Sequence, residues 1–348
     1  MIASGAVASA GAHHLILGAR RRVAGWLEGA ATAKGLGAWE RLAGTLPLDP
    51  SRRVRLPVHS CVIGVGGATL GGSGRTPVAI ALALALRDRG LDVALVGHGY
   101  RGRVGAARVV APDDSVELVG DEALLAARAL RDRAPVVVGR DRDEAIALAA
   151  RHASFVVVDR LLQSRPRPLH YAVLAVDART PWGSGRVVPF GDLVAPRTAL
   201  VAAADEVLAV GGADAPERIA LVGQGGALDG SSLVGVRVGV VTSVARPRRV
   251  LRALAAVGVA PAVHVERDDH SPSSTSERAL LAGLASAHHL ELWLACAKSA
   301  LHLPRMAGVP VVSIAHSIEP SSRLIERMLR IAEARAARVA PYDASPIR

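Results

Sequence analysis

The stretch that decides the fold runs from Cys61 to Gly90 and reads CVIGVGGATLGGSGRTPVAIALALALRDRG. It predicts an apolar strand over Cys61–Gly66, a glycine-rich turn, and a helix over Pro77–Arg89 that stops at Gly90. Glycines let the backbone fold tightly, so that successive N–H groups and the positive end of the helix dipole face an anion. This order of elements predicts a phosphate-binding loop.

The loop departs from the strict G-x-x-x-x-G-K-[ST] pattern at two positions. Thr69 stands at the first glycine position and Arg75 at the lysine position. Arginine keeps the positive charge, but its planar fork is bulkier than an ammonium group. Thr76 stands where a P-loop Ser or Thr coordinates Mg²⁺. The alternative is a glycine-rich turn without a ligand. The candidate nucleotide-binding residues are Gly71, Gly72, Ser73, Gly74, Arg75 and Thr76.

From the strand at 61–66 onward, short β-rich runs alternate with helical stretches rich in Ala, Leu and Arg. Such alternation is typical of a mostly parallel sheet covered on both faces. One series of predicted strands lies at 61–66, 92–97, 135–138, 155–159 and 172–177, and a second at 206–210, 218–222, 236–242, 262–265, 291–295 and 309–314. The fold class is therefore α/β: a P-loop NTPase-like parallel sheet domain, a second, smaller α/β domain, and an N-terminal amphipathic helix.

The Pro/Gly-rich stretch Thr180–Pro196 has no periodicity and divides the two series. We therefore expect an N-terminal basic, membrane-associating segment at 1–38 and a P-loop nucleotide-binding domain at 39–200. A second α/β domain at 201–348 would complete the active-site cleft, where a two-substrate enzyme holds both ligands.

Composition suits a folded protein with an acidic partner. Half of the 348 residues are hydrophobic and 21% are charged, which argues against disorder. The net charge of +11 favours phosphorylated substrates or anionic surfaces as partners. The sequence has no arginine-rich helix interleaved with aromatics, so a nucleic-acid partner is not expected. Lys34 and Lys298 are the only lysines, so the chain uses arginine almost everywhere a cation occurs. An arginine at a given position is therefore weak evidence that its bidentate hydrogen bonding is needed there. Cys61 and Cys296 are expected to be buried free thiols in a reducing cytoplasm.

The segment His13–Ala31 interleaves Leu, Ile, Val and Trp26 with three consecutive arginines, 20–22. A basic amphipathic helix of this kind lies in a membrane interface, with its arginines among anionic headgroups. The alternative is a helix packed on the protein's own core. No run in the chain approaches the roughly 20 apolar residues that a spanning helix needs.

The loop and several later motifs resemble the tetraacyldisaccharide 4'-kinase family. The family loop reads like V-G-N-x-T-V-G-G-T-G-K-T-P, and VGGATLGGSGRTP at 65–77 aligns with it without a gap, Thr69 included. Family S-R-G-Y-G/R resembles GHGYR at 97–101, and G-D-E-P/A-L-L matches GDEALL at 120–125. Family D-D-G-x-Q-H keeps only Asp159 and Gln163 in DRLLQS.

The resemblance continues to residue 303. The family segment V-D-A-x-x-x-x-G-N-G-R-L-L-P-x-G-x-L-R-E-P resembles VDARTPWGSGRVVPFGDLVAP at 176–196. R-P-x-R-F resembles RPRRV at 246–250, F-x-D-H-H-x-Y resembles RDDHS at 267–271, and T-x-K-D-A-V-K-L resembles CAKSALHL at 296–303. The matches occur in order from residue 62, which is more specific than any single motif.

The resemblance implies an ATP-dependent kinase at the cytoplasmic face of the bacterial inner membrane, with MgATP as donor and no obligate protein partner. The acceptor would be the 4'-hydroxyl of a lipid-linked substrate, tetraacyldisaccharide 1-phosphate, in lipid A biosynthesis. It also implies Asp121 as base paired with His270. Asp159 ends the apolar run FVVVD, where a carboxylate in a P-loop fold helps hold Mg²⁺, and is expected to act there with Thr76. Each of these residues also has a purely structural interpretation. Asp121 could be a helix N-cap, His270 an ordinary loop residue, and Asp159 an ordinary residue at the end of a strand.

Four departures from the family pattern support a different hypothesis, a degenerate member that binds nucleotide or lipid without phosphoryl transfer. These are Arg75 for Lys, Arg160 for Asp, Ser164 for His and Ser299 for Asp. A soluble P-loop NTPase acting as a regulator is a third hypothesis, which the matches beyond residue 200 disfavour. His98 replaces a family arginine and is a further candidate to face phosphate.

Overall fold

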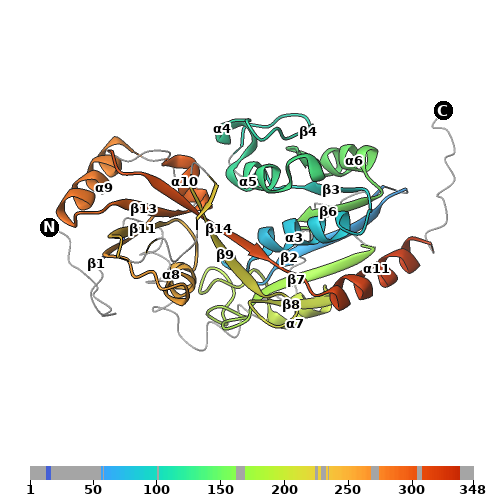
Figure 1. Ribbon diagram of the computed structural model, residues 1–348. Coiled ribbons are helices and arrows are strands. Elements are labelled where there is room, and N and C mark those ends of the chain that lie inside the picture. Colours follow the sequence, from blue (N-terminus) through green and yellow to red (C-terminus); the bar gives the residue numbers. More distant parts are fainter. Residues whose placement is uncertain are drawn as a thin grey trace. The chain divides into compact units, whose positions relative to one another are not determined.

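The computed structural model describes residues 13–16, 56–57, 59–99, 102–161, 169–223, 226–228, 233, 235–267, 274–303 and 308–337. Contacts divide the chain into two compact units. One contains strand β1 (His13–Ile16) and the described residues from Arg218 to Ser317. The other contains the described residues from Leu56 to Glu217 and, beyond Ser317, the C-terminal helix α11 (Ser322–Ala336). Each unit is built on a seven-stranded, mainly parallel sheet, which confirms the predicted α/β class (Figure 1).

The phosphate-loop unit has the strand order β4-β5-β3-β6-β2-β7-β8. Its parallel strands are β2 (Cys61–Gly67), β3 (Val93–Val96), β5 (Val136–Val138), β6 (Phe155–Asp159), β7 (Tyr171–Asp177) and β8 (Glu206–Val210), with β4 (Arg108–Val109) antiparallel at one edge. Every residue of β2, β3, β6 and β7 is buried, as expected for apolar strands covered on both faces.

Helices cover both faces of this sheet (Figure 1). They are α3 (Arg75–Arg87), α4 (Val116–Val119), α5 (Asp121–Leu130), α6 (Arg142–His152) and α7 (Arg197–Ala202), besides α11 and a 3₁₀ turn at Arg131–Arg133. Val156 and Val158 of β6 share a core cluster with Ile146 of α6. Because side chains alternate along a strand, Asp159 projects to the opposite face, where α3 packs on β6.

The second unit has the strand order β1-β12-β11-β13-β14-β9-β10. Its strands after β1 are β9 (Glu217–Gly223), β10 (Gly226–Leu228), β11 (Val238–Thr242), β12 (Val263–Glu266), β13 (Leu292–Cys296) and β14 (Val311–Ile318), and its helices are α8 (Pro247–Ala256), α9 (Thr275–Ala287) and α10 (Ala297–His302). Trp293 of β13 is fully buried in a cluster with Leu281 of α9, which anchors that helix to the sheet.

The division between the units differs from the predicted boundary at residues 200 and 201. Strand β8 pairs with β7 in the phosphate-loop sheet, and the contact division falls after Glu217. Helix α11 also belongs to this unit, because Arg335 Nη2 lies 2.7 Å from Asp205 Oδ1 and Arg327 forms an ion pair with Glu206. These ion pairs join residues more than a hundred positions apart, so no local pattern indicates them.

The predicted N-terminal helix over His13–Ala31 is wrong for its first four residues. His13–Ile16 form β1, which pairs in parallel with Val263–Glu266 of β12. Pairing with a neighbouring strand here outweighs the local helical pattern. The rest of the predicted helix lies outside the described residues.

Both cysteines are buried and free, as predicted. Burial, with a smaller contribution from the Glu333 carboxylate, raises the pKa of the Cys61 thiol to about 12. Cys61 therefore stays protonated at physiological pH and packs as a small apolar residue.

Candidate functional site

The glycine-rich loop joins β2 to α3 and has the backbone that a phosphate cradle requires. Gly74 is the N-cap of α3 with φ 76°, and Gly72 has φ 77°, both in the left-handed region that favours glycine. A Cβ on Gly67 would lie 2.3 Å from Ser73 Oγ, so the chain there can pass close only without a side chain. These residues leave the α3 N-terminus as a ready anion site.

The loop is supported by the stretch predicted to divide the domains. Leu70 N donates to Asp192 O at 2.8 Å, and Val194 N donates to Ala68 O at 3.0 Å. Thr69 is fully buried between these bonds and bridges to Leu193. The Pro/Gly-rich stretch is therefore packed against the phosphate loop, and its lack of periodicity comes from turns.

Asp159 connects the loop to the neighbouring strand. Its Oδ1 accepts from Arg75 Nε at 2.7 Å, and its Oδ2 accepts from Thr76 Oγ1 at 2.7 Å. The pairing of Val65 with Asp159 places the carboxyl end of β6 beside the start of the loop. Asp159 is 1% exposed and Arg75 7%, so the ion pair between them is buried. Arg142 of α6 donates to the Asp159 carbonyl at 2.5 Å.

Thr76 and Asp159 fit the expected magnesium site. Their oxygens Oγ1 and Oδ2 are 2.7 Å apart, close to the roughly 3 Å between adjacent ligands of an octahedral ion with bonds of about 2.1 Å. Within the described part of the chain, no group of three or more His, Cys, Asp or Glu side chains could hold a metal. Mg²⁺ commonly binds through one or two protein oxygens with phosphate and water as the other ligands, which suits this pair.

Asp121 is the first residue of α5 and is 3% exposed. Gly120, with φ 83°, occupies the N-cap position, so Asp121 is not the N-cap that the purely structural interpretation assumed. Its Oδ1 accepts from Glu122 N at 2.7 Å. Asp121 therefore lies at the positive end of the α5 helix dipole.

Glu122 and Arg160, which follow the predicted site residues Asp121 and Asp159, also lie at the site. The sequence predicted no role for Glu122, and Arg160 was noted only as a departure from the family pattern. Glu122 Oε2 lies 3.9 Å from Arg75 Nη2 and 3.8 Å from Arg160 Nη2. Glu122 therefore brings the N-terminus of α5 to the phosphate loop. Arg142 was also missed, since nothing in its local sequence shows that α6 begins beside Asp159.

His98 follows β3 at the same edge of the sheet and is half-buried. Its pKa is lowered to about 3, mainly by burial and also by the Arg160, Arg142 and Arg75 guanidiniums, while the Glu122 carboxylate acts in the opposite direction. His98 is therefore neutral at pH 7 in the protein without a ligand, and a neutral imidazole can donate a hydrogen bond.

Not every predicted site residue can be placed. His270, Gln163 and Ser164 lie outside the described residues. In the second unit, Ser299 is fully buried, and its Oγ lies 2.9 Å from Ser243 Oγ at the carboxyl end of β11.

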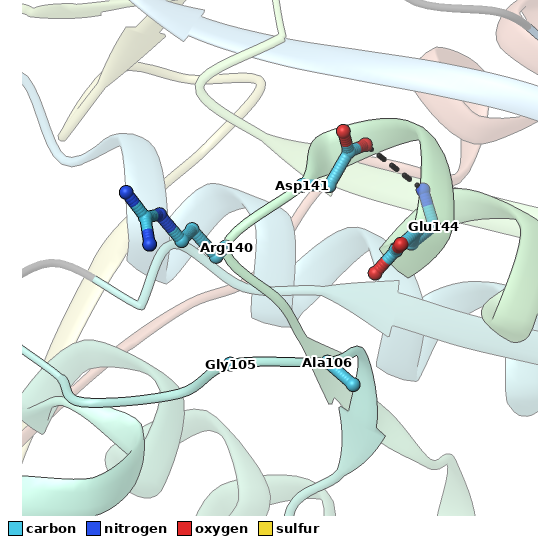
Figure 2. Close-up of a pocket in the computed structure, with 5 residues that line it drawn as sticks. All are labelled: Gly105, Ala106, Arg140, Asp141 and Glu144. Carbon is cyan, nitrogen blue, oxygen red and sulfur yellow. Dashed lines mark hydrogen bonds between the residues drawn. The ribbon is translucent and has the colours of Figure 1, made fainter.

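A shallow pocket lies at the turn between β5 and α6 (Figure 2). Asp141 Oδ1 accepts from Glu144 N at 3.1 Å and so caps the helix that carries Arg142. The pocket's lining contains no predicted site residue and consists of Gly105, Ala106, Arg140, Asp141 and Glu144.

The sequence profile of the family described as Tetraacyldisaccharide-1-P 4'-kinase matches residues 45–332. The chain belongs to this family. The tetraacyldisaccharide 4'-kinase of Methylobacterium nodulans is 33% identical over 299 residues, covering 80% of this chain and 87% of that protein. The tetraacyldisaccharide 4'-kinase of Methylorubrum extorquens is 31% identical over 302 residues, covering 83% and 91%. The matched region includes the phosphate loop, Asp121, Asp159 and the position of His270.

The fold of this kinase family member also matches a solved structure. The crystal structure of the "apo" form LpxK from Aquifex aeolicus in complex with ATP superposes with a TM-score of 0.63 and covers 86% of this chain and 98% of that chain. At 18% sequence identity the likeness concerns the fold.

His98 gives a testable consequence of the site's electrostatics. Its pKa in the folded protein, about 3, is below the ordinary 6.5, so the unfolded chain takes up the proton first as the pH falls. This residue therefore stabilises the fold fully above pH 6.5 and progressively less down to pH 3. In NMR titrations we expect no His98 transition above pH 4, and His98→Asn should reduce the loss of unfolding free energy between pH 6.5 and 4. A His98 transition near pH 6 would contradict the described environment.

Proposed function

We propose that this protein transfers the γ-phosphoryl group of ATP to the 4'-hydroxyl of a tetraacyldisaccharide 1-phosphate, a step of lipid A biosynthesis. The observation that carries the proposal is the bonding of Asp159 to both Arg75 and Thr76 at the α3 N-terminus, in a chain that belongs to the 4'-kinase family. A glycine loop, a cation, a hydroxyl and a strand-end carboxylate are the parts that phosphoryl transfer needs for positioning and charge neutralisation.

Each residue has a proposed role in that reaction. The amides of Gly71–Gly74 and the side chain of Arg75 would hold the β- and γ-phosphates. Thr76 and Asp159 would hold Mg²⁺, which would offset the negative charge of the phosphates. Asp121 accepts the proton of the 4'-hydroxyl while that oxygen bonds to the γ-phosphorus and the bond from phosphorus to ADP breaks. His270 as the partner of Asp121 stays a prediction from the resemblance.

The comparisons give no support to the alternative of a protein that binds nucleotide or lipid without phosphoryl transfer. Arg75, the departure most damaging to a P-loop, is accommodated: its guanidinium pairs with Asp159 in the described structure. The loop therefore keeps a cation at the lysine position, with part of its charge offset by Asp159.

The direct test incubates the purified protein with MgATP and tetraacyldisaccharide 1-phosphate and detects the bis-phosphorylated product by mass spectrometry. Asp121→Asn should lower kcat about 100-fold or more, because proton transfer is lost. ATP affinity should stay unchanged, since Asn keeps an oxygen that can accept from Glu122 N. Intact ATP binding without any product from the wild-type protein would sink the kinase proposal, and a fully active Asp121→Asn would remove Asp121 from it.

We also propose that the protein works at the cytoplasmic face of the inner membrane, attached through its basic N-terminal segment. The acyl chains of the proposed substrate and the arginines at 20–22 support this placement. Among the described residues, no helix is long and apolar enough to cross a bilayer. In flotation with vesicles that contain anionic lipid, removing residues 17–31, which leaves β1 in place, should reduce binding several-fold; binding equal to that of the full chain would rule out this attachment.

A further inference from the structure

Arg160 is an unusual residue at the end of β6. It follows Asp159 directly and carries a positive charge where the resembling family has an acid. Its φ of 64° lies in the left-handed region, which arginine rarely adopts. Such backbone strain persists where the surroundings enforce it, and it concentrates at functional sites.

The surroundings of Arg75 in the phosphate loop explain why a second positive charge at Arg160 would be useful. Arg75 is 7% exposed, its Nε is bonded to Asp159, and its Nη2 faces Glu122. A loop lysine would present one compact ammonium group to the phosphates, whereas this guanidinium is shared between two carboxylates. The positive charge that the loop itself offers to a nucleotide is therefore partly neutralised.

Glu122 holds the two guanidiniums at one place. Its Oε2 lies 3.9 Å from Arg75 Nη2 and 3.8 Å from Arg160 Nη2. The Arg160 side chain is 22% exposed, so it can meet a ligand at the edge of the sheet while one of its nitrogens faces Glu122. A cation fixed in this way before the ligand arrives costs little reorganisation when charge develops.

We propose that Arg160 binds the γ-phosphoryl group of ATP during transfer, as a cation supplied by this chain in place of the family's acidic residue. Arg160 would neutralise charge on the equatorial oxygens of the transferring group, the role of an arginine finger in cis. The exchanges at Arg75 and Arg160 then belong together: part of the charge that Arg75 offers the phosphates is offset by Asp159 and Glu122, and Arg160 supplies further positive charge. The inference rests on the proposed ATP-dependent kinase function.

The test measures the affinities of ATP and ADP, each with Mg²⁺, by calorimetry. Arg160→Asn removes the charge and tolerates the left-handed backbone, so the variant should fold. ATP affinity should fall about tenfold or more, because a charge-assisted hydrogen bond to the γ-phosphate is lost. ADP affinity should stay within about twofold, since ADP lacks that phosphate. Arg160→Lys should recover part of the ATP preference. The control Arg151→Gln removes an exposed arginine from the end of α6 and should leave both affinities unchanged.

Turnover provides the second readout. If Arg160 is a preorganised donor to the transition state, kcat of Arg160→Asn should fall about 100-fold or more. Equal losses of ATP and ADP affinity would show a purely structural partner of Glu122 and overturn the inference, as would no change in either. A wild-type protein that prefers ATP through Arg160 but forms no lipid product would refute the kinase function and leave the γ-phosphate contact standing.

Discussion

The phosphate-loop site depends on one buried carboxylate, that of Asp159. Burying this charge is unfavourable unless its oxygens are paired, and here one oxygen accepts from Arg75 and the other from Thr76. Because the three residues come from adjacent elements, β6 and the start of α3, the same bonds that satisfy the charge fix the position of the helix N-terminus. Removing Arg75 would leave an uncompensated buried charge, and removing the Thr76 hydroxyl would take one hydrogen bond from the carboxylate, so the arrangement ties the fold of the unit to the geometry of its site.

This constraint explains why an arginine can occupy the lysine position of the loop. A guanidinium has five N–H donors in a fixed fork, so Arg75 can bond to Asp159 through Nε and still face Glu122 through Nη2. A lysine offers a single ammonium on a flexible stem. Glu122 lies in the family-matched stretch GDEALL, and its contact with Arg75 holds the start of α5, with the adjacent Asp121, at the same edge of the sheet.

The sequence could predict the parts of this site that are local. The order of strand, glycine turn and helix between Cys61 and Arg87, and the strand that ends at Asp159, follow from contiguous patterns and were expected. The roles of Glu122 and Arg142 could not be predicted, because their distances to the loop depend on how α5 and α6 begin at the sheet edge. The observed division falls after Glu217 and not at the predicted residues 200 and 201 for a similar reason: β8 pairs with β7 at the sheet edge, and α11 contacts β8 from a distant part of the chain.

The most direct test of this account is calorimetry of ATP binding with and without Mg²⁺, for the wild-type protein, Asp159→Asn and Thr76→Val. If Thr76 and Asp159 together hold the ion, Mg²⁺ strengthens ATP binding to the wild-type protein. Each variant should lose most of that strengthening, about tenfold or more, while ATP binding without Mg²⁺ changes little. The same dependence on Mg²⁺ in all three proteins would contradict the central role assigned to Asp159.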